Sequence, residues 1–73
     1  MVQFSRNYVE KYVGKIVHLN KEIFEELKTR AIHQGQLLEN YFVVSAVSQN
    51  FKKLICYGAN FRVVVDVSEV VLV

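Results

Sequence analysis

The chain has 73 residues, of which 52% are hydrophobic, and nine basic against seven acidic side chains give a formal charge of +2. That length suffices for a single domain, residues 1–73, and the composition excludes a disordered chain. No run of about 18 uncharged apolar residues occurs, which excludes a membrane-spanning helix, and the first residues lack the pattern of a secretory signal.

The first predicted element is a short helix over residues 5–13. Ser5 is a suitable N-terminal cap, and Gly14 stands where a helix-ending glycine is expected. Four residues recur at a helical spacing: Tyr8, Val9, Tyr12 and Val13. Tyrosine and valine also favour strands, so a strand is the alternative for this segment.

Residues 15–19 form a short, mostly apolar strand that leads into the clearest helix of the chain, residues 21–34. Asn20 is a favourable N-cap, because its side-chain oxygen can accept a backbone N–H that has no partner in the first turn. Acidic residues near the start and basic residues near the end match the helix dipole, and Gly35 ends the helix. One face carries an apolar stripe: Ile23, Phe24, Leu27 and Ala31.

After Gln36 the apolar pattern changes to a period of two, which predicts strands. These strands, with turns between the first three, are residues 41–48, 51–57, 61–67 and 70–73. In the third of them, one face is lined by Phe61, Val63, Val65 and Val67. Short turns between consecutive strands require an antiparallel meander.

The predicted fold class is therefore α+β, a curved antiparallel meander of about four or five strands with the helix 21–34 packed on it. The apolar stripe of this helix covers one face of the sheet. The strands 15–19 and 70–73 protect the sheet edges, or curl the sheet into a small barrel of the Src-homology type. The apolar strand 70–73 is also suited to pair with another chain.

Side chains capable of catalysis are few and scattered. His18 and His33 have no second histidine or cysteine at ligand spacing, so no zinc site is predicted. Cys56 is the only cysteine, which fits a reducing compartment and predicts a cytoplasmic protein. A nucleophile pair with a histidine is the alternative for Cys56, but its apolar neighbours favour a buried core residue. The sequence also has no glycine-rich phosphate loop. We therefore predict a protein that is not an enzyme and uses no metal or cofactor.

Two groups of residues are candidates for binding. Basic and aromatic side chains on neighbouring strands resemble a surface that stacks bases and neutralises phosphates: Phe51, Lys52, Lys53, Tyr57 and Arg62. A lysine-rich strand edge that keeps the protein soluble is the alternative interpretation. Candidate anchors for a protein interface are the aromatic residues of the N-terminal segment: Phe4, Tyr8 and Tyr12.

We therefore predict a small non-catalytic protein-binding domain that serves as an adaptor, an inhibitor or a subunit. Its size is typical of proteins that phages or mobile elements encode to act on host machinery. The expected partner is another protein or a second copy of the chain. We expect no binding to a membrane. Nucleic-acid binding is the competing hypothesis, and the salt dependence of binding separates the two.

Overall fold

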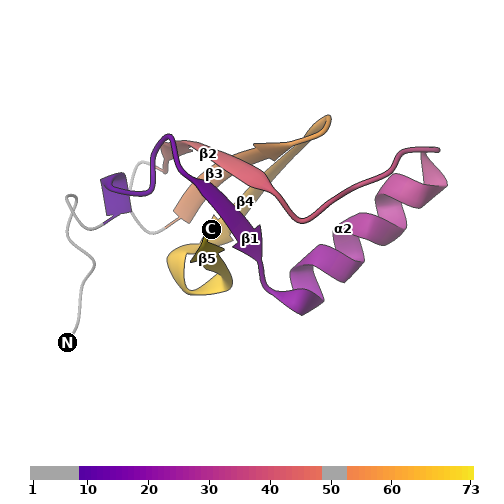
Figure 1. The fold of residues 1–73 in the computed structure, drawn as a ribbon, viewed down its shortest axis with the longest axis horizontal. Helices are drawn as coiled ribbons and strands as arrows, with labels where there is room; N and C mark the ends of the chain where they lie inside the picture. The colour runs from indigo at the N-terminus through magenta and orange to yellow at the C-terminus, as the bar shows by residue number, and fades with distance from the viewer. Residues whose placement is uncertain (1–8, 49–52) are drawn as a thin grey trace.

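The computed structural model describes residues 9–48 and 53–73. These residues form a 13-residue helix and a five-stranded antiparallel sheet, and Figure 1 shows the helix beside the sheet. In chain order the elements are β1 (Ile16–Leu19), α2 (Lys21–His33), β2 (Phe42–Val47), β3 (Lys53–Gly58), β4 (Phe61–Asp66) and β5 (Val70–Leu72). A short 3₁₀ helix, η1 (Val67–Glu69), joins β4 to β5. The predicted α+β class and the antiparallel sheet are confirmed.

The strands lie side by side in the order β4-β3-β2-β1-β5, and every neighbouring pair is antiparallel. β4 and β5 follow each other in the chain, yet they form the two opposite edges of the sheet. The sheet must therefore curve, because η1 alone connects these edges. β4 and β5 do not pair along the described residues, so the sheet is open and the predicted small barrel is not confirmed.

Helix α2 begins as its sequence predicts. The Oδ1 atom of Asn20 accepts the N–H of Ile23 at 3.0 Å, which gives one first-turn N–H a partner. The helix ends at His33, and Gly35 follows with a φ of +72°, a left-handed conformation that glycine adopts without strain. Two residues of the predicted stripe are buried: Leu27 and Ala31. No helix within residues 9–48 and 53–73 combines the length and the apolar character that crossing a membrane requires.

The core lies between α2 and one face of the sheet, which we call the inner face. Buried and exposed residues alternate along the strands, as in β3, because successive side chains point to opposite sides. Val63 and Val65 of β4 are buried, as predicted for their face. The largest fully buried side chains are Phe42, Leu54, Val9, Val17, Val44 and Cys56.

The segment before β1 also contributes to the core. Residues 9 and 10 are helical and residues 11–14 form a turn, whereas residues 5–8 of the predicted helix lie outside the described residues. Val9 and Tyr12 belong to the same buried cluster as the strands. The N–H of Gly14 donates to the carbonyl of Val44 at 2.8 Å, which attaches this turn to β2.

The β3–β4 hairpin has a two-residue turn, Ala59–Asn60, which Gly58 and Phe61 close as paired residues. Ala59 has a φ of 50°, a conformation that alanine adopts only at some cost. Gly58 is buried, and a Cβ atom placed on it would lie 2.4 Å from Cδ2 of Phe42. The glycine therefore allows the ring of Phe42 to pack directly against β3.

Asn40 connects the start of β2 to the end of β1. Its Oδ1 accepts the N–H of Leu19 at 2.7 Å, and its Nδ2 donates to the carbonyl of Leu19 at 2.9 Å. The amide side chain thus takes the place of a neighbouring strand at Leu19. His18 of β1 adds another contact between these two strands, because its Nδ1 hydrogen-bonds the backbone carbonyl of Asn40.

Candidate binding surface

The side of the sheet that faces away from α2, which we call the outer face, is largely apolar. One row of cross-strand neighbours crosses four strands: Ile16, Val43, Tyr57 and Arg62. Large apolar side chains of this face are exposed to solvent: Ile16 47%, Val43 47%, Tyr57 46%, Val64 46% and Val71 65%. Soluble domains rarely expose a contiguous apolar surface unless it binds something.

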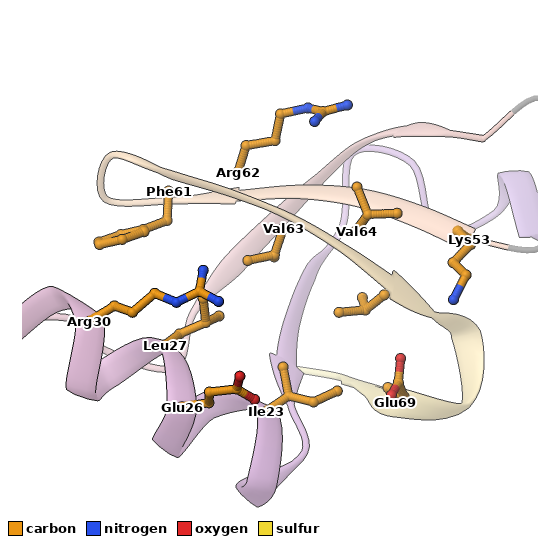
Figure 2. A pocket seen from close by; sticks show the side chains of 11 residues that line it. Ile23, Glu26, Leu27, Arg30, Lys53, Phe61, Arg62, Val63, Val64 and Glu69 are labelled. Atoms are coloured by element: carbon orange, nitrogen blue, oxygen red, sulfur yellow. The ribbon is translucent and has the colours of Figure 1, made fainter.

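The side chains of β4 alternate between the inner face and the outer face of the sheet. Figure 2 shows Phe61 and Val63 directed toward α2, whereas Arg62 and Val64 point away from it. Between α2 and β4 lies an open cavity of about 440 Å³. We call this cavity the edge groove, because its wall includes consecutive residues of an edge strand, 61–65.

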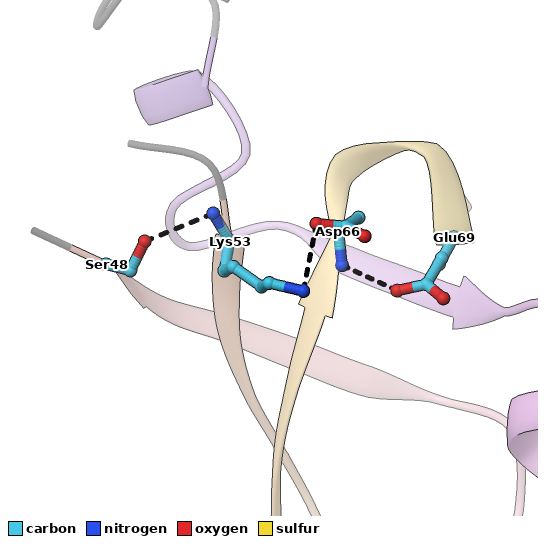
Figure 3. Close-up of polar contacts among 4 residues, drawn as sticks. All are labelled: Ser48, Lys53, Asp66 and Glu69. Carbon is cyan, nitrogen blue, oxygen red and sulfur yellow. Dashed lines mark hydrogen bonds and ion pairs between the residues drawn. The ribbon is translucent and has the colours of Figure 1, made fainter. Parts of the chain in front are cut away.

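Polar contacts fix the end of β4 that is distant from the hairpin turn. The Nζ atom of Lys53 lies 3.2 Å from Oδ1 of Asp66, and the N–H of Asp66 donates to Oε1 of Glu69 at 2.7 Å (Figure 3). The N–H of Lys53 donates to Oγ of Ser48 at 3.1 Å. Asp66 therefore balances the charge of Lys53, although both side chains are close to half exposed and the ion pair is screened by water.

The structure brings together part of the predicted nucleic-acid surface. Tyr57 and Arg62 are exposed and lie directly opposite each other on β3 and β4. Lys53 belongs to the same strand as Tyr57, but its ammonium group contacts Asp66. The other two residues of that prediction, Phe51 and Lys52, lie outside the described residues.

The predicted protein-interface anchors fall in different places. Phe4 and Tyr8 lie outside the described residues. Tyr12 lies in the core with 9% of its surface exposed. The exposed apolar surface is instead formed by strand residues that the sequence did not single out: Ile16, Val43, Val64 and Val71. The available signal was that both alternating positions of these strands are apolar, which exceeds what one covered face requires.

The reactive side chains are placed where they have structural roles. Cys56 is fully buried, and this burial raises the pKa of its thiol from 9.0 to about 11, so the nucleophilic thiolate is disfavoured at neutral pH. The imidazoles of His18 and His33 bind the backbone carbonyls of Asn40 and Thr29. Among the described residues, no three acidic, histidine or cysteine side chains gather in a way that could hold a metal ion.

Comparisons of the chain with models of protein families, with curated proteins and with solved structures each found no match. The assignment of a function therefore depends on the surfaces described above.

Proposed function

We propose that this chain is a non-catalytic protein-binding domain and that the outer face of its sheet is the binding surface. The proposal depends on one observation, the exposed apolar row that crosses β1, β2 and β3 at Ile16, Val43 and Tyr57. Burial of such side chains by a partner stabilises a complex by about 25 cal/mol for each Å² of apolar surface removed from water. A protein partner with a complementary apolar surface would bury these side chains and so form a stable complex.

The composition of the outer face also suits a protein interface. Tyr57 is a large aromatic residue that lies between Val43 of β2 and the charged Arg62 of the edge strand β4. Aromatic residues surrounded by apolar neighbours, with charges at the rim, supply most of the binding energy of typical interfaces. Side chains held on a sheet lose little conformational entropy on binding.

A domain of this kind serves as an adaptor, an inhibitor or a subunit, including one that acts on the machinery of a host cell. The short connection from β4 through η1 to β5 supports a finer assignment of the fold. It links the two edges of the sheet as a small barrel of the Src-homology type requires. We include that barrel in the proposal.

Affinity capture from cell lysate, with and without nuclease, tests the proposed function. Val43→Lys places a charge in the centre of the outer face, while Ile32→Lys places the same charge at an apolar position of α2 that is 61% exposed. We expect proteins that the wild type and Ile32→Lys retain and that Val43→Lys loses, regardless of nuclease. Identical retention by the two variants, with both folded by circular dichroism, would contradict the proposal.

Nucleic-acid binding is the second candidate, because the pairing of Tyr57 with Arg62 places an aromatic ring beside a guanidinium group on the exposed face. The contact between Lys53 and Asp66 works against it, since an acidic group beside the surface repels phosphates. A fluorescent single-stranded oligonucleotide provides the test. Binding that weakens steeply with salt and is lost in Arg62→Ala would favour this candidate over the first.

A further inference from the structure

The free edge of β4 is a surface distinct from the outer face. β4 is the last strand on its side of the sheet, with β3 as its only neighbour in the described residues. An edge strand exposes backbone N–H and C=O groups that can pair with another strand. The edge groove lies along this strand from Phe61 to Val65, so the described chain leaves the edge open there.

The register of the hairpin shows which backbone groups point outward. A two-residue turn closes with a hydrogen-bonded pair, here Gly58 and Phe61, and hydrogen-bonded pairs then alternate with non-bonded ones along the ladder. Tyr57–Arg62 and Ile55–Val64 are therefore non-bonded pairs. The N–H and C=O groups of Arg62 and Val64 consequently point away from β3, toward the free edge.

Contacts at the end of the ladder agree with this alternation. Asp66 lies two residues after Val64 and four after Arg62, so its backbone groups also point away from β3. Its N–H accordingly binds the carboxylate of Glu69 (Figure 3). On the opposite strand, Lys53 directs its N–H away from β4, toward Ser48. Glu69 accepts the last N–H of the edge, and within the described part of the chain no strand pairs with the outward groups of Arg62 and Val64.

The sequence of β4 is complementary to itself when read in the opposite direction. Its six residues are Phe-Arg-Val-Val-Val-Asp. In an antiparallel pair of two such strands centred on Val64, each Val64 faces the other, and Val63 faces Val65. The same register places Arg62 of each strand opposite Asp66 of the other. Oppositely charged residues directly across an antiparallel pair stabilise it, and valines suit it.

We propose that a second copy of this chain pairs with β4 along its free edge, antiparallel and centred on Val64. The two Val64 residues exchange backbone N–H···O bonds, and each Arg62 N–H reaches the carbonyl of Asp66 in the other copy. The side chain of Arg62 then meets the carboxylate of that Asp66, which already contacts Lys53. A carboxylate has enough acceptor sites for both cations.

The edge groove fits this occupant. In the paired arrangement, the inner-face valines of the second copy point to the same side as Val63 of the first, which Figure 2 shows directed toward α2, and the edge groove lies on that side. Ile23 and Leu27 of α2 line that side with apolar surface. The pairing also joins the two outer faces into one continuous surface, since the row through Val64 continues into the second copy. The pairing itself does not depend on the proposed function of the outer face.

Sedimentation velocity of the purified chain, from micromolar to near-millimolar concentration, tests the pairing. We expect the wild type to convert from monomer to dimer as concentration rises. Arg62→Glu places two like-charged pairs in the interface and should raise the dissociation constant by about tenfold or more. Lys28→Glu, on the exposed side of α2, changes the net charge equally and should leave the dissociation constant unchanged.

A mixture of variants tests the register. Arg62→Glu alone and Asp66→Lys alone each oppose like charges across the pair, whereas an equal mixture restores opposite charges at both contacts. We therefore expect two weakly associating proteins that form a heterodimer when mixed. Val64→Pro removes an N–H that no strand among residues 9–48 and 53–73 uses, and it should abolish the dimer while the domain still unfolds cooperatively.

The proposal is overturned by a wild type that stays monomeric throughout the range, by a dimer that neither Arg62→Glu nor Val64→Pro weakens, or by single variants that do not associate more strongly when mixed. A dimer lost in Val43→Lys but kept in Arg62→Glu would also overturn it, by assigning self-association to the outer face. The first three results do not bear on whether another protein binds the outer face.

Discussion

Replacing Gly58 by alanine tests how closely the β3–β4 hairpin packs on the core. A Cβ atom at this position would lie 2.4 Å and 2.6 Å from Cδ2 and Cε2 of Phe42, and 2.9 Å from the backbone oxygen of Tyr41. Phe42 is completely buried, so its ring moves only if neighbouring core side chains move, and a backbone oxygen moves only with its strand. Both neighbours therefore resist the added methyl group.

The expected loss of stability follows from these contacts. Adding a methyl group to a packed core costs about 1–3 kcal/mol, and we expect about 2–3 kcal/mol here because one of the close neighbours is backbone. For a domain of this size, each kcal/mol corresponds to about 4–8 °C in melting temperature. Gly58→Ala should therefore lower the melting temperature by roughly 8–24 °C.

Urea and thermal unfolding, followed by circular dichroism, measure this loss. Gly35→Ala is the control, since nothing lies within 4 Å of its added Cβ and only its φ of +72° opposes the change; we expect about 1 kcal/mol. Phe42→Leu in the Gly58→Ala background should recover part of the loss, because the smaller side chain vacates the ring position. A Gly58→Ala protein as stable as Gly35→Ala, or no coupling to Phe42→Leu, would refute the packing argument.

Leu27→Asp should abolish cooperative unfolding, because Leu27 is 7% exposed in the core and the new carboxylate has no partner there; a normal melting transition would show that α2 does not pack as described. Ala59→Gly should raise the free energy of unfolding by about 0.5–1 kcal/mol, since glycine adopts the φ of 50° without strain, and an unchanged urea midpoint would contradict this. Burial raises the pKa of the Cys56 thiol to about 11, so the folded state holds this proton more tightly than the unfolded chain. The free energy of unfolding should thus fall between pH 9.0 and about pH 11, and Cys56→Ala should reduce that fall. If the variant and the wild type lose the same stability over this pH range, Cys56 is not the cause of the fall.

Local signals in the sequence were sufficient to predict α2 and the five strands. The Asn20 cap and Gly35 define the helix to within one residue, 21–34 against Lys21–His33. Alternating apolar residues located β2, β3 and β4 to within two residues at each end. These signals depend only on residues close together in the sequence, so they can be recognised without knowledge of the tertiary structure.

The candidate surfaces depend on pairings that no local pattern contains. β1 pairs with β2 across the whole of α2, and with β5 across residues 20–69, so no local pattern reveals the row from Ile16 to Tyr57. Val43 and Val44 are adjacent and both apolar, yet one is 47% exposed and the other fully buried. The elements that pack on the inner face, α2 and the segment before β1, decide which of them is covered. The register shift between Val44 and Ala46 likewise has no glycine or proline to mark it.

The position of β1 within the sheet also sets an order of assembly. β2, β3 and β4 pair through consecutive segments of the chain, whereas β5 has to find β1 across a much longer loop. Closing long loops is slow because of their entropy. We expect the β2–β3–β4 meander to form first during refolding, and pulse-labelling hydrogen exchange should protect Cys56 and Val63 before Val71. Until β1 arrives, β2 is itself an uncovered edge strand, so a slow step at this point would favour aggregation over completion of the native sheet.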